Sequence, residues 1–431
     1  MITDVETTQP EIPYAELVLP DRVNSRVYTD EAIFADELEK IWHKDWLYIG
    51  HESEVAKAGD YVARRMGRQP VVLARGVDNK VRVLMNRCPH RGNTVCLEDS
   101  GNVDHFRCAY HGWMFNTDGT PKGVPYSLGY GKDFEKNDFS MSVVPRMEIY
   151  RGFVFASLSP TGIDLKAKLG RTAAYLDRFC DTAPEGEIDL SAGALKTRVH
   201  GNWKMVYENI CDGYHPPFLH RSVFAAASRD GLVIGDAYGD QSLIVTRDLD
   251  NGHMMLDFTE TNRLTGGPVF DIGGVVPPEA VQAHRAAVKA RMGEEEGERI
   301  LNDGLSNVSI CPNLGLLYQD VRVIEPVSAN ETIIYNFPAL LKGAPREINR
   351  ARLYQEVRAY GPAGSVGPDD HEIYERNQSG FGATLNNWVV LKRGLERQYR
   401  DEDGTLVGNA SDEVTQRAFW RQYLSMMTTA D

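Results

Sequence analysis

The sequence lacks several features that would assign it to common classes of protein. It has no run of about 18 apolar residues, the length that a membrane-spanning helix needs. Its first residues, MITDVETTQPEIPYAE, lack the apolar core of a secretory signal. Basic residues are outnumbered, 47 against 61 acidic ones, and the net charge of -14 opposes binding to phosphate backbones. We therefore expect a cytoplasmic protein that binds neither membranes nor nucleic acid.

Cysteine is scarce as well. Six Cys in 431 residues do not form a disulfide framework, and a reducing compartment suits metal ligation better. No Gly-rich dinucleotide loop is present, so NADH or a flavin is not expected to bind this chain directly. Four of the cysteines are expected to be small buried residues: Cys96, Cys180, Cys211 and Cys311.

The hydrophobic pattern changes along the chain. Residues 29–46 have apolar side chains at helical spacing, and 165–220 and the part beyond 345 are mostly helical in pattern. Short β-rich runs separated by Gly, Asn and Asp turns lie at 61–67, 70–76, 80–86 and 151–158. Further strands, with one polar helix at 280–304, are predicted at 242–249, 315–326 and 331–340.

These patterns predict an α+β fold, in which a small all-β domain is inserted near the start of a larger α+β domain. There is no internal repeat and no low-complexity linker. The predicted boundaries are 1–45 for an N-terminal helical part of the larger domain, 46–162 for the β domain and 163–431 for the rest of the larger domain.

Two Cys/His pairs lie on loops inside the β-rich part. RCPHRG contains Cys88 and His90, and CAYHGW contains Cys108 and His111. A zinc knuckle generally takes two cysteines or two histidines from each half. Here each half supplies one thiolate and one imidazole, which is the ligand set of a Rieske [2Fe-2S] cluster. The pattern favours the cluster over zinc.

A second ligand set lies in ENICDGYHPPFLH, residues 208–220. On one continuous helix, His215 and His220 would point about 140° apart. Pro216 and Pro217 end or kink that helix, so the two imidazoles can converge. Two His and one carboxylate form the facial triad at which iron(II) activates oxygen.

The third ligand has three candidates. Asp212 is three residues before His215, on the same helical face, and is also well placed to orient that imidazole from behind. Asp369 and Asp370 follow Pro368 at a predicted helix start, where a carboxylate is rigidly held. The pattern alone does not choose among them.

Together these motifs resemble the large (α) subunit of the Rieske non-haem iron ring-hydroxylating oxygenases. The resemblance rests on the two Cys/His pairs, NWK at 202–204, the motif at 208–220 and DHEIYERNQSG at 370–380. It implies a catalytic domain of the helix-grip (START-like) type, with an antiparallel sheet flanked by helices. It also implies that Cys88, His90, Cys108 and His111 hold the cluster, and that His215, His220 and Asp370 hold a mononuclear iron(II).

The resemblance further implies how the chain works with others. Asp212 matches the carboxylate that links the cluster of one subunit to the iron of its neighbour, so a trimer of α subunits is expected, alone or with three small β subunits. Electrons from NAD(P)H would arrive through a reductase, a ferredoxin or both, and O2 would be the co-substrate. The implied reaction is mono- or dihydroxylation of a monocyclic aromatic carboxylate such as salicylate, anthranilate or benzoate. The expected pocket residues are Phe218, Asn307, Val308 and Leu314.

Three other functions fit parts of the pattern. The same iron site would serve an oxygenase for biaryl or polycyclic hydrocarbons, or an enzyme that removes methyl groups or oxidises quaternary amines. A Rieske electron carrier would be the non-enzymatic alternative. It would need only the β-rich part, and the second ligand set argues against it.

Overall fold

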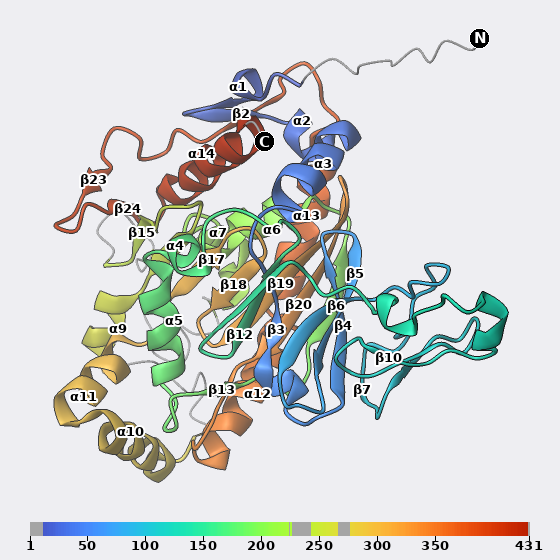
Figure 1. The fold of residues 1–431 in the computed structure, drawn as a ribbon. Coiled ribbons are helices and arrows are strands. Elements are labelled where there is room, and N and C mark those ends of the chain that lie inside the picture. The colour runs from blue at the N-terminus through green and yellow to red at the C-terminus, as the bar shows by residue number, and fades with distance from the viewer. Residues whose placement is uncertain (1–11, 224, 226–242, 266–275, 430–431) are drawn as a thin grey trace.

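The computed structural model describes residues 12–223, 225, 243–265 and 276–429 (Figure 1). The start of the predicted first domain and parts of 226–275 lie outside the described residues. Short N-terminal elements come first: α1 (Tyr14–Leu17), β1 (Val18–Leu19), β2 (Arg22–Asn24) and α2 (Arg26–Thr29).

The helix predicted at 29–46 is present. Asp30 is its N-cap, and its carboxylate accepts a hydrogen bond from the backbone N–H of Ala32 at 2.9 Å. The helix runs as α3 (Glu31–Glu37) and continues as one π-helical turn, η1 (Leu38–Trp42), so it ends before Trp46. Its apolar side is fully buried, as the amphipathic pattern predicted.

The β-rich part forms three small antiparallel sheets, which confirms the four predicted runs to within two residues at each end. One sheet has the order β6-β5-β4-β7, the second β10-β9-β8, and the third β11-β12-β3. Their strands are β3 (Leu47–His51), β4 (Asp60–Met66), β5 (Gln69–Arg75), β6 (Val81–Met85), β7 (Ser100–Asn102), β8 (Phe106–Arg107), β9 (Met114–Phe115), β10 (Pro121–Gly123), β11 (Arg146–Tyr150) and β12 (Phe153–Ser157). Figure 1 shows β10 and its neighbouring loops projecting to the right of the larger domain.

The larger domain is built on a nine-stranded antiparallel sheet with the order β14-β20-β19-β18-β17-β16-β15-β24-β23. The predicted α+β fold with an antiparallel sheet flanked by helices is therefore confirmed. The strands are β14 (Leu195–Val199), β15 (Val245–Asp248), β16 (Met254–Asp257), β17 (Asn307–Ile310), β18 (Leu314–Leu317), β19 (Asp320–Ser328), β20 (Glu331–Pro338), β23 (Tyr399–Arg400) and β24 (Leu406–Asn409).

Two buried clusters cover the two faces of this sheet. Along β19, Val321 and Val323 belong to one cluster and Ile324 to the other, as the alternation of side chains in a strand requires. The face of Ile324 is covered by α6 (Trp203–Ile210) and α14 (Val414–Thr428), and the face of Val321 and Val323 is covered by α5 (Thr172–Asp181) and α10 (Pro278–Met292). The remaining described helices are α4 (Leu165–Leu169), α7 (Pro216–Leu219), α9 (Thr259–Thr265), α11 (Glu294–Asp303), α12 (Arg346–Tyr360) and α13 (Gly367–Gly380).

Several predicted elements differ from the structure for local reasons. The polar helix at 280–304 is two helices, α10 and α11, because Gly293 between them has a φ of 91°. The strand at 315–326 is a hairpin that turns at Tyr318, which has a φ of 58°. The helical pattern at 165–220 is interrupted by β13 (Ile188–Asp189) and β14, and the part beyond 345 also contains β22 (Trp388–Val390), β23 and β24.

Candidate functional site

Two loops of similar form hold the first ligand set. Cys88 and His90 lie between β6 and β7, and Cys108 and His111 lie between β8 and β9. In each loop the residue four positions after the cysteine is a glycine of positive φ, and its backbone N–H donates to the cysteine carbonyl, at 2.9 Å in the first loop and 3.0 Å in the second. The glycines let both loops turn back tightly beneath their thiols.

The four side chains converge between these loops. The rings of His90 and His111 have their centroids 4.6 Å apart, and both thiols are buried. Burial opposes ionisation of Cys108, but the backbone N–H groups of Tyr110 and His111 outweigh it, so the pKa of this thiol lies below its usual value. The Nδ1 atom of His90 is buried without a hydrogen-bond partner. Thiols that accept backbone N–H bonds and an imidazole with a free nitrogen suit a cluster with two Cys and two His ligands.

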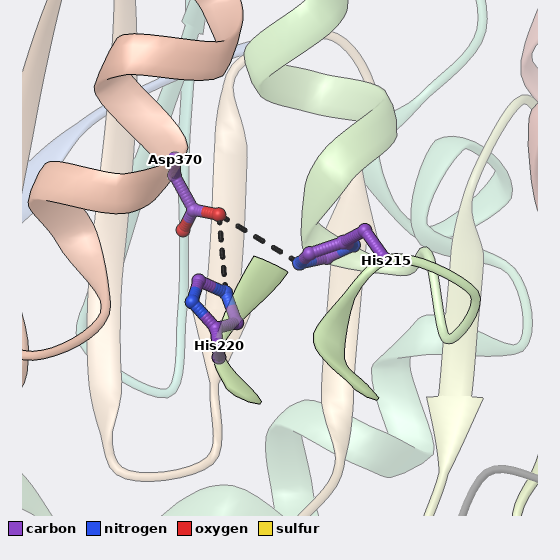
Figure 2. A group of neighbouring side chains, drawn as sticks. All are labelled: His215, His220 and Asp370. Atoms are coloured by element: carbon purple, nitrogen blue, oxygen red, sulfur yellow. Dashed lines mark ion pairs between the residues drawn. The ribbon is translucent and has the colours of Figure 1, made fainter. Parts of the chain in front are cut away.

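The side chains of the second ligand set also lie close together. His215 is the N-cap of α7, His220 is its C-cap, and Asp370 lies in the first turn of α13 (Figure 2). Asp370 Oδ1 lies 3.7 Å from Nε2 of His215 and 3.2 Å from Nε2 of His220. One possible ligand atom from each residue lies within 4.8 Å of the others. Because metal–nitrogen bonds are about 2.1 Å long, ligand atoms on one ion lie roughly 3 to 4 Å apart, so the three residues fit a single ion.

The helix that carries this motif ends earlier than predicted. The last residue of α6 is Ile210, and the two prolines are the first residues of α7 rather than the end of α6. Asp212 therefore does not share a helical face with His215, and that part of the prediction was wrong, although Asp212 does lie behind the His215 imidazole as predicted. The end of α6 is fixed from outside, because the Thr415 hydroxyl donates to the Cys211 carbonyl at 3.0 Å and caps the helix.

A carboxylate lies behind each imidazole. Asp212 Oδ2 is 3.4 Å from Nδ1 of His215, and Asp369 Oδ2 is 3.5 Å from Nδ1 of His220. The structure thus separates the two neighbouring aspartates: Asp370 faces both Nε2 atoms, whereas Asp369 lies behind one ring. A carboxylate in this position fixes the tautomer and the direction of the imidazole in front of it.

The charges around the triad favour the ionised aspartate. Burial raises the pKa of Asp370, but His220 and His215 outweigh it, so the pKa lies below its usual value. Burial likewise lowers the pKa of His215, and Asp212 reverses that effect, which leaves the pKa above its usual value. An anionic oxygen facing two imidazole nitrogens is the donor set that iron(II) binds.

Two further residues of the motif at 208–220 make polar contacts that the sequence did not indicate. Asn209 points its amide at the site, with Nδ2 3.4 Å from both His215 Nε2 and Asp370 Oδ1. Glu208 is buried and accepts hydrogen bonds from Tyr28 and Trp420, and burial raises its pKa to about 8. Both belong to the quoted motif, but the motif gives no sign of which way they point.

The predicted pocket residues have different surroundings. Asn307 lies on the α6 face of the sheet, and its amide donates to the Ile210 carbonyl at 3.1 Å. Val308 and Leu314 are fully buried in the cluster on the opposite face. Phe218, in α7 between the two iron-site histidines, is 69% exposed. Of the three residues on the sheet, only Asn307 is therefore on the face that α6 covers; Val308 and Leu314 are on the other face.

The other cysteines behave as expected. All six are free, and Cys96, Cys180, Cys211 and Cys311 are buried. None of the described helices is long and apolar enough to cross a membrane.

A Cys2His2 loop pair in a small β domain, joined to a His-His-carboxylate triad in an α+β domain, defines a Rieske-type non-haem iron oxygenase. Comparison with known families agrees. Residues 45–130 match the Rieske [2Fe-2S] domain, and residues 186–429 match the ring hydroxylating alpha subunit (catalytic domain). The chain belongs to the α subunits of the aromatic ring-hydroxylating dioxygenases, which are oxidoreductases that incorporate O2.

Individual relatives support this membership. The chain is 31% identical over 389 residues to the large subunit of 2-halobenzoate 1,2-dioxygenase from Burkholderia cepacia, covering 86% of this chain and 80% of the relative. It is 29% identical over 436 residues to the α subunit of biphenyl 2,3-dioxygenase from Rhodococcus jostii, covering 95% and 90%. The structure of naphthalene 1,2-dioxygenase with indole bound in the active site superposes with a TM-score of 0.82, at 25% identity and with 96% and 94% of the two chains covered.

Proposed function

We propose that this terminal oxygenase subunit hydroxylates a monocyclic aromatic carboxylate, such as salicylate, anthranilate or benzoate, with O2 and electrons relayed from NAD(P)H. The observation that carries the proposal is the convergence of His215, His220 and Asp370 within 4.8 Å in the part of the chain that matches the catalytic family. The similarity to a 2-halobenzoate dioxygenase supports an aromatic acid as substrate.

The residues divide between two cofactors. Cys88, His90, Cys108 and His111 would hold the [2Fe-2S] cluster, and His215, His220 and Asp370 the iron. The bound groups supply one-electron storage and activation of O2. We assign these roles within the proposed domains 46–162 and 163–431, with 1–45 as the N-terminal part of the catalytic domain.

The protein's own side chains set up the iron site. Carboxylate oxygens of Asp212 and Asp369 lie 3.4 and 3.5 Å from Nδ1 of the two imidazoles, and both Nε2 atoms face Asp370. Asp370 is kept ionised at neutral pH by those imidazoles. The amide of Asn209 lies beside both His215 and Asp370, where it restricts the room for a further ligand.

We further propose that Asp212 links this site to the cluster domain of a neighbouring subunit. The carboxylate is about one-third exposed, and its Oδ1 atom accepts a hydrogen bond from the backbone N–H of Tyr214 at 2.6 Å. Each carboxylate oxygen can accept a second bond, so the exposed side can still take a donor from a neighbouring subunit. This role requires an oligomer, for which we propose a trimer of α subunits, with or without small β subunits. A ferredoxin, a reductase or both would deliver the electrons, because the sequence has no dinucleotide-binding loop.

A second candidate substrate is a biaryl hydrocarbon, favoured by the similarity to a biphenyl 2,3-dioxygenase. The two candidates are separated by measuring O2 consumption and product formation with salicylate, anthranilate, benzoate and biphenyl. We expect O2 uptake and hydroxylation to be tightly coupled with at least one acid. Tight coupling with biphenyl alone would overturn the acid proposal. Formaldehyde released from a methylated substrate would instead identify a demethylase.

A further inference from the structure

A tyrosine lies beside one of the two cluster imidazoles. The hydroxyl oxygen of Tyr130 is 3.3 Å from Nε2 of His90, within hydrogen-bond distance. The other ring nitrogen, Nδ1, is buried and has no hydrogen-bond partner in the part of the chain that the structure describes. The two nitrogens of this ring therefore have different surroundings, and only Nδ1 is left for a metal.

The local backbone explains why Tyr130 reaches the ring. The segment follows β10, in the projecting part of the β domain (Figure 1), and forms a single 3-10 turn, η3 (Ser127–Tyr130). The turn begins after Tyr126, whose φ is 52°, and ends at Gly131, whose φ is 88°. Both values are left-handed, so the chain changes direction on each side of the turn. Tyr126 is 96% exposed and Tyr130 only 45%, so of the two tyrosines it is Tyr130 that packs against the domain.

Aromatic packing fixes the position of this side chain. The rings of Tyr130 and Phe134 are stacked, with 4.5 Å between their centroids and 21° between their planes. The ring of Tyr130 is also nearly perpendicular to that of Trp113, at a centroid distance of 6.1 Å. Trp113 in turn is stacked on His90, at 5.1 Å and 6°. The imidazole and the tyrosine therefore pack on the same indole, and the hydroxyl loses little further freedom when it binds Nε2.

This hydrogen bond favours one tautomer of the imidazole. A neutral imidazole has its proton on one nitrogen, and the other nitrogen is the one that can bind a metal. With Nδ1 as the ligand atom, Nε2 has the proton and donates it to the oxygen of Tyr130. An acceptor in this position fixes the direction of the ring and makes the imidazole a stronger electron donor to the metal.

The second imidazole has no such partner. His111 is exposed, and its ring lies 3.8 Å from that of Tyr110, centroid to centroid. Its ring nitrogens make no hydrogen bond with any residue that the structure describes. The two histidines are therefore not equivalent, because the fold supplies an acceptor for His90 alone.

We propose that Tyr130 is a positioning residue for the [2Fe-2S] cluster. Its hydroxyl accepts the Nε2–H of His90, directs Nδ1 of that ring to the iron, and lowers the reduction potential of the cluster. The potential falls because the hydrogen bond stabilises the oxidised form more than the reduced form: oxidised iron withdraws more electron density from the imidazole and makes Nε2–H a stronger donor. This inference rests on the cluster ligands assigned in the proposed function, but not on any substrate.

The test is the reduction potential of the cluster, measured on the holoenzyme by redox titration and followed by EPR. Tyr130→Phe removes the hydroxyl and keeps the ring, so the stacking on Phe134 is retained. We expect this variant to favour reduction about three- to tenfold, which is a rise of about 30 to 60 mV for a one-electron couple. Tyr126→Phe is the matched control, because it removes an exposed hydroxyl next to the same turn and should leave the potential unchanged.

A role in packing alone would not change the potential, because phenylalanine fills nearly the same space as tyrosine. An unchanged or lower potential in Tyr130→Phe therefore overturns the proposal. If Tyr130→Phe does not take up a cluster, Phe134→Leu gives the answer, since it keeps the hydroxyl but removes the ring on which Tyr130 is stacked. A higher potential in Phe134→Leu would then support the proposal, and an unchanged one would overturn it.

The outcomes also separate this inference from the proposed function. If the wild type gives the EPR signal of a reduced [2Fe-2S] cluster and Tyr130→Phe has the same potential, only the role of Tyr130 fails. If the wild type binds neither iron nor sulfide at these ligands, the cluster assignment fails, and the proposed oxygenase function fails with it.

Discussion

The substitution Gly213→Ala tests whether contact with Ala410, in the C-terminal part of the chain, positions the loop that carries Asp212 and His215. A Cβ atom on Gly213 would lie 2.2 Å from the Ala410 carbonyl oxygen, whereas ordinary contacts begin at 3.4 Å. Gly213→Ala therefore has to move the loop by about 1 Å, and this loop contains both Asp212 and His215. Overpacking of this kind costs roughly 1 to 3 kcal/mol of stability. A misplacement of about 1 Å at a reacting centre lowers the rate about 100-fold.

The assay measures the iron content, the rate of coupled hydroxylation and the thermal stability of each variant. Gly380→Ala is the matched control, because Gly380 ends α13 and a Cβ atom there meets nothing within 4 Å. We expect Gly213→Ala to lose mononuclear iron and about 99% of its turnover, and Gly380→Ala to be neutral or stabilised by about 0.5 to 1 kcal/mol. Full iron content and wild-type turnover in Gly213→Ala would refute the idea that contact with Ala410 holds the ligand loop in place.

Three further predictions concern single side chains. Asp212→Asn should keep both metals but lower coupled product formation at least about 10- to 100-fold, and normal product formation would remove its bridging role. His215→Ala should lose the mononuclear iron while the EPR signal of the reduced cluster persists; iron retained at wild-type levels would contradict the ligand assignment. Burial and the charge of Lys168 lower the pKa of His253 to about 3. The contribution of the neutral imidazole to the free energy of unfolding is therefore fully present above the unfolded pKa near 6.5, and it is lost as the pH decreases from there toward 3. Between pH 7.5 and 5.0, His253→Gln should therefore lose about 2 kcal/mol less unfolding free energy than the wild type in urea titrations, and equal losses would show that His253 does not titrate in this way.

The ligand sets could be read from the sequence because each pair of ligands is local. Cys88 and His90 are separated by one residue, and each cluster loop closes on its own backbone, so no distant contact is needed to form it. The strands of the β domain were predicted for the same reason, since Gly, Asn and Asp turns separate them clearly.

The parts that were not predicted depend on distant contacts. The end of α6 accepts a hydrogen bond from Thr415, about 200 residues further along the chain, and the sequence gives no sign of that contact. The choice between Asp369 and Asp370 required the direction of α13 relative to α7.

The positions of the two ligand sets along the chain also have a consequence for biosynthesis. All four cluster ligands fall within residues 88–111. The iron ligands come later, and Asp370 lies in α13, close to the C-terminal end of the chain. The ribosome therefore makes every ligand of the cluster before the first ligand of the iron site, and the iron site obtains its third ligand only when most of the chain has been made.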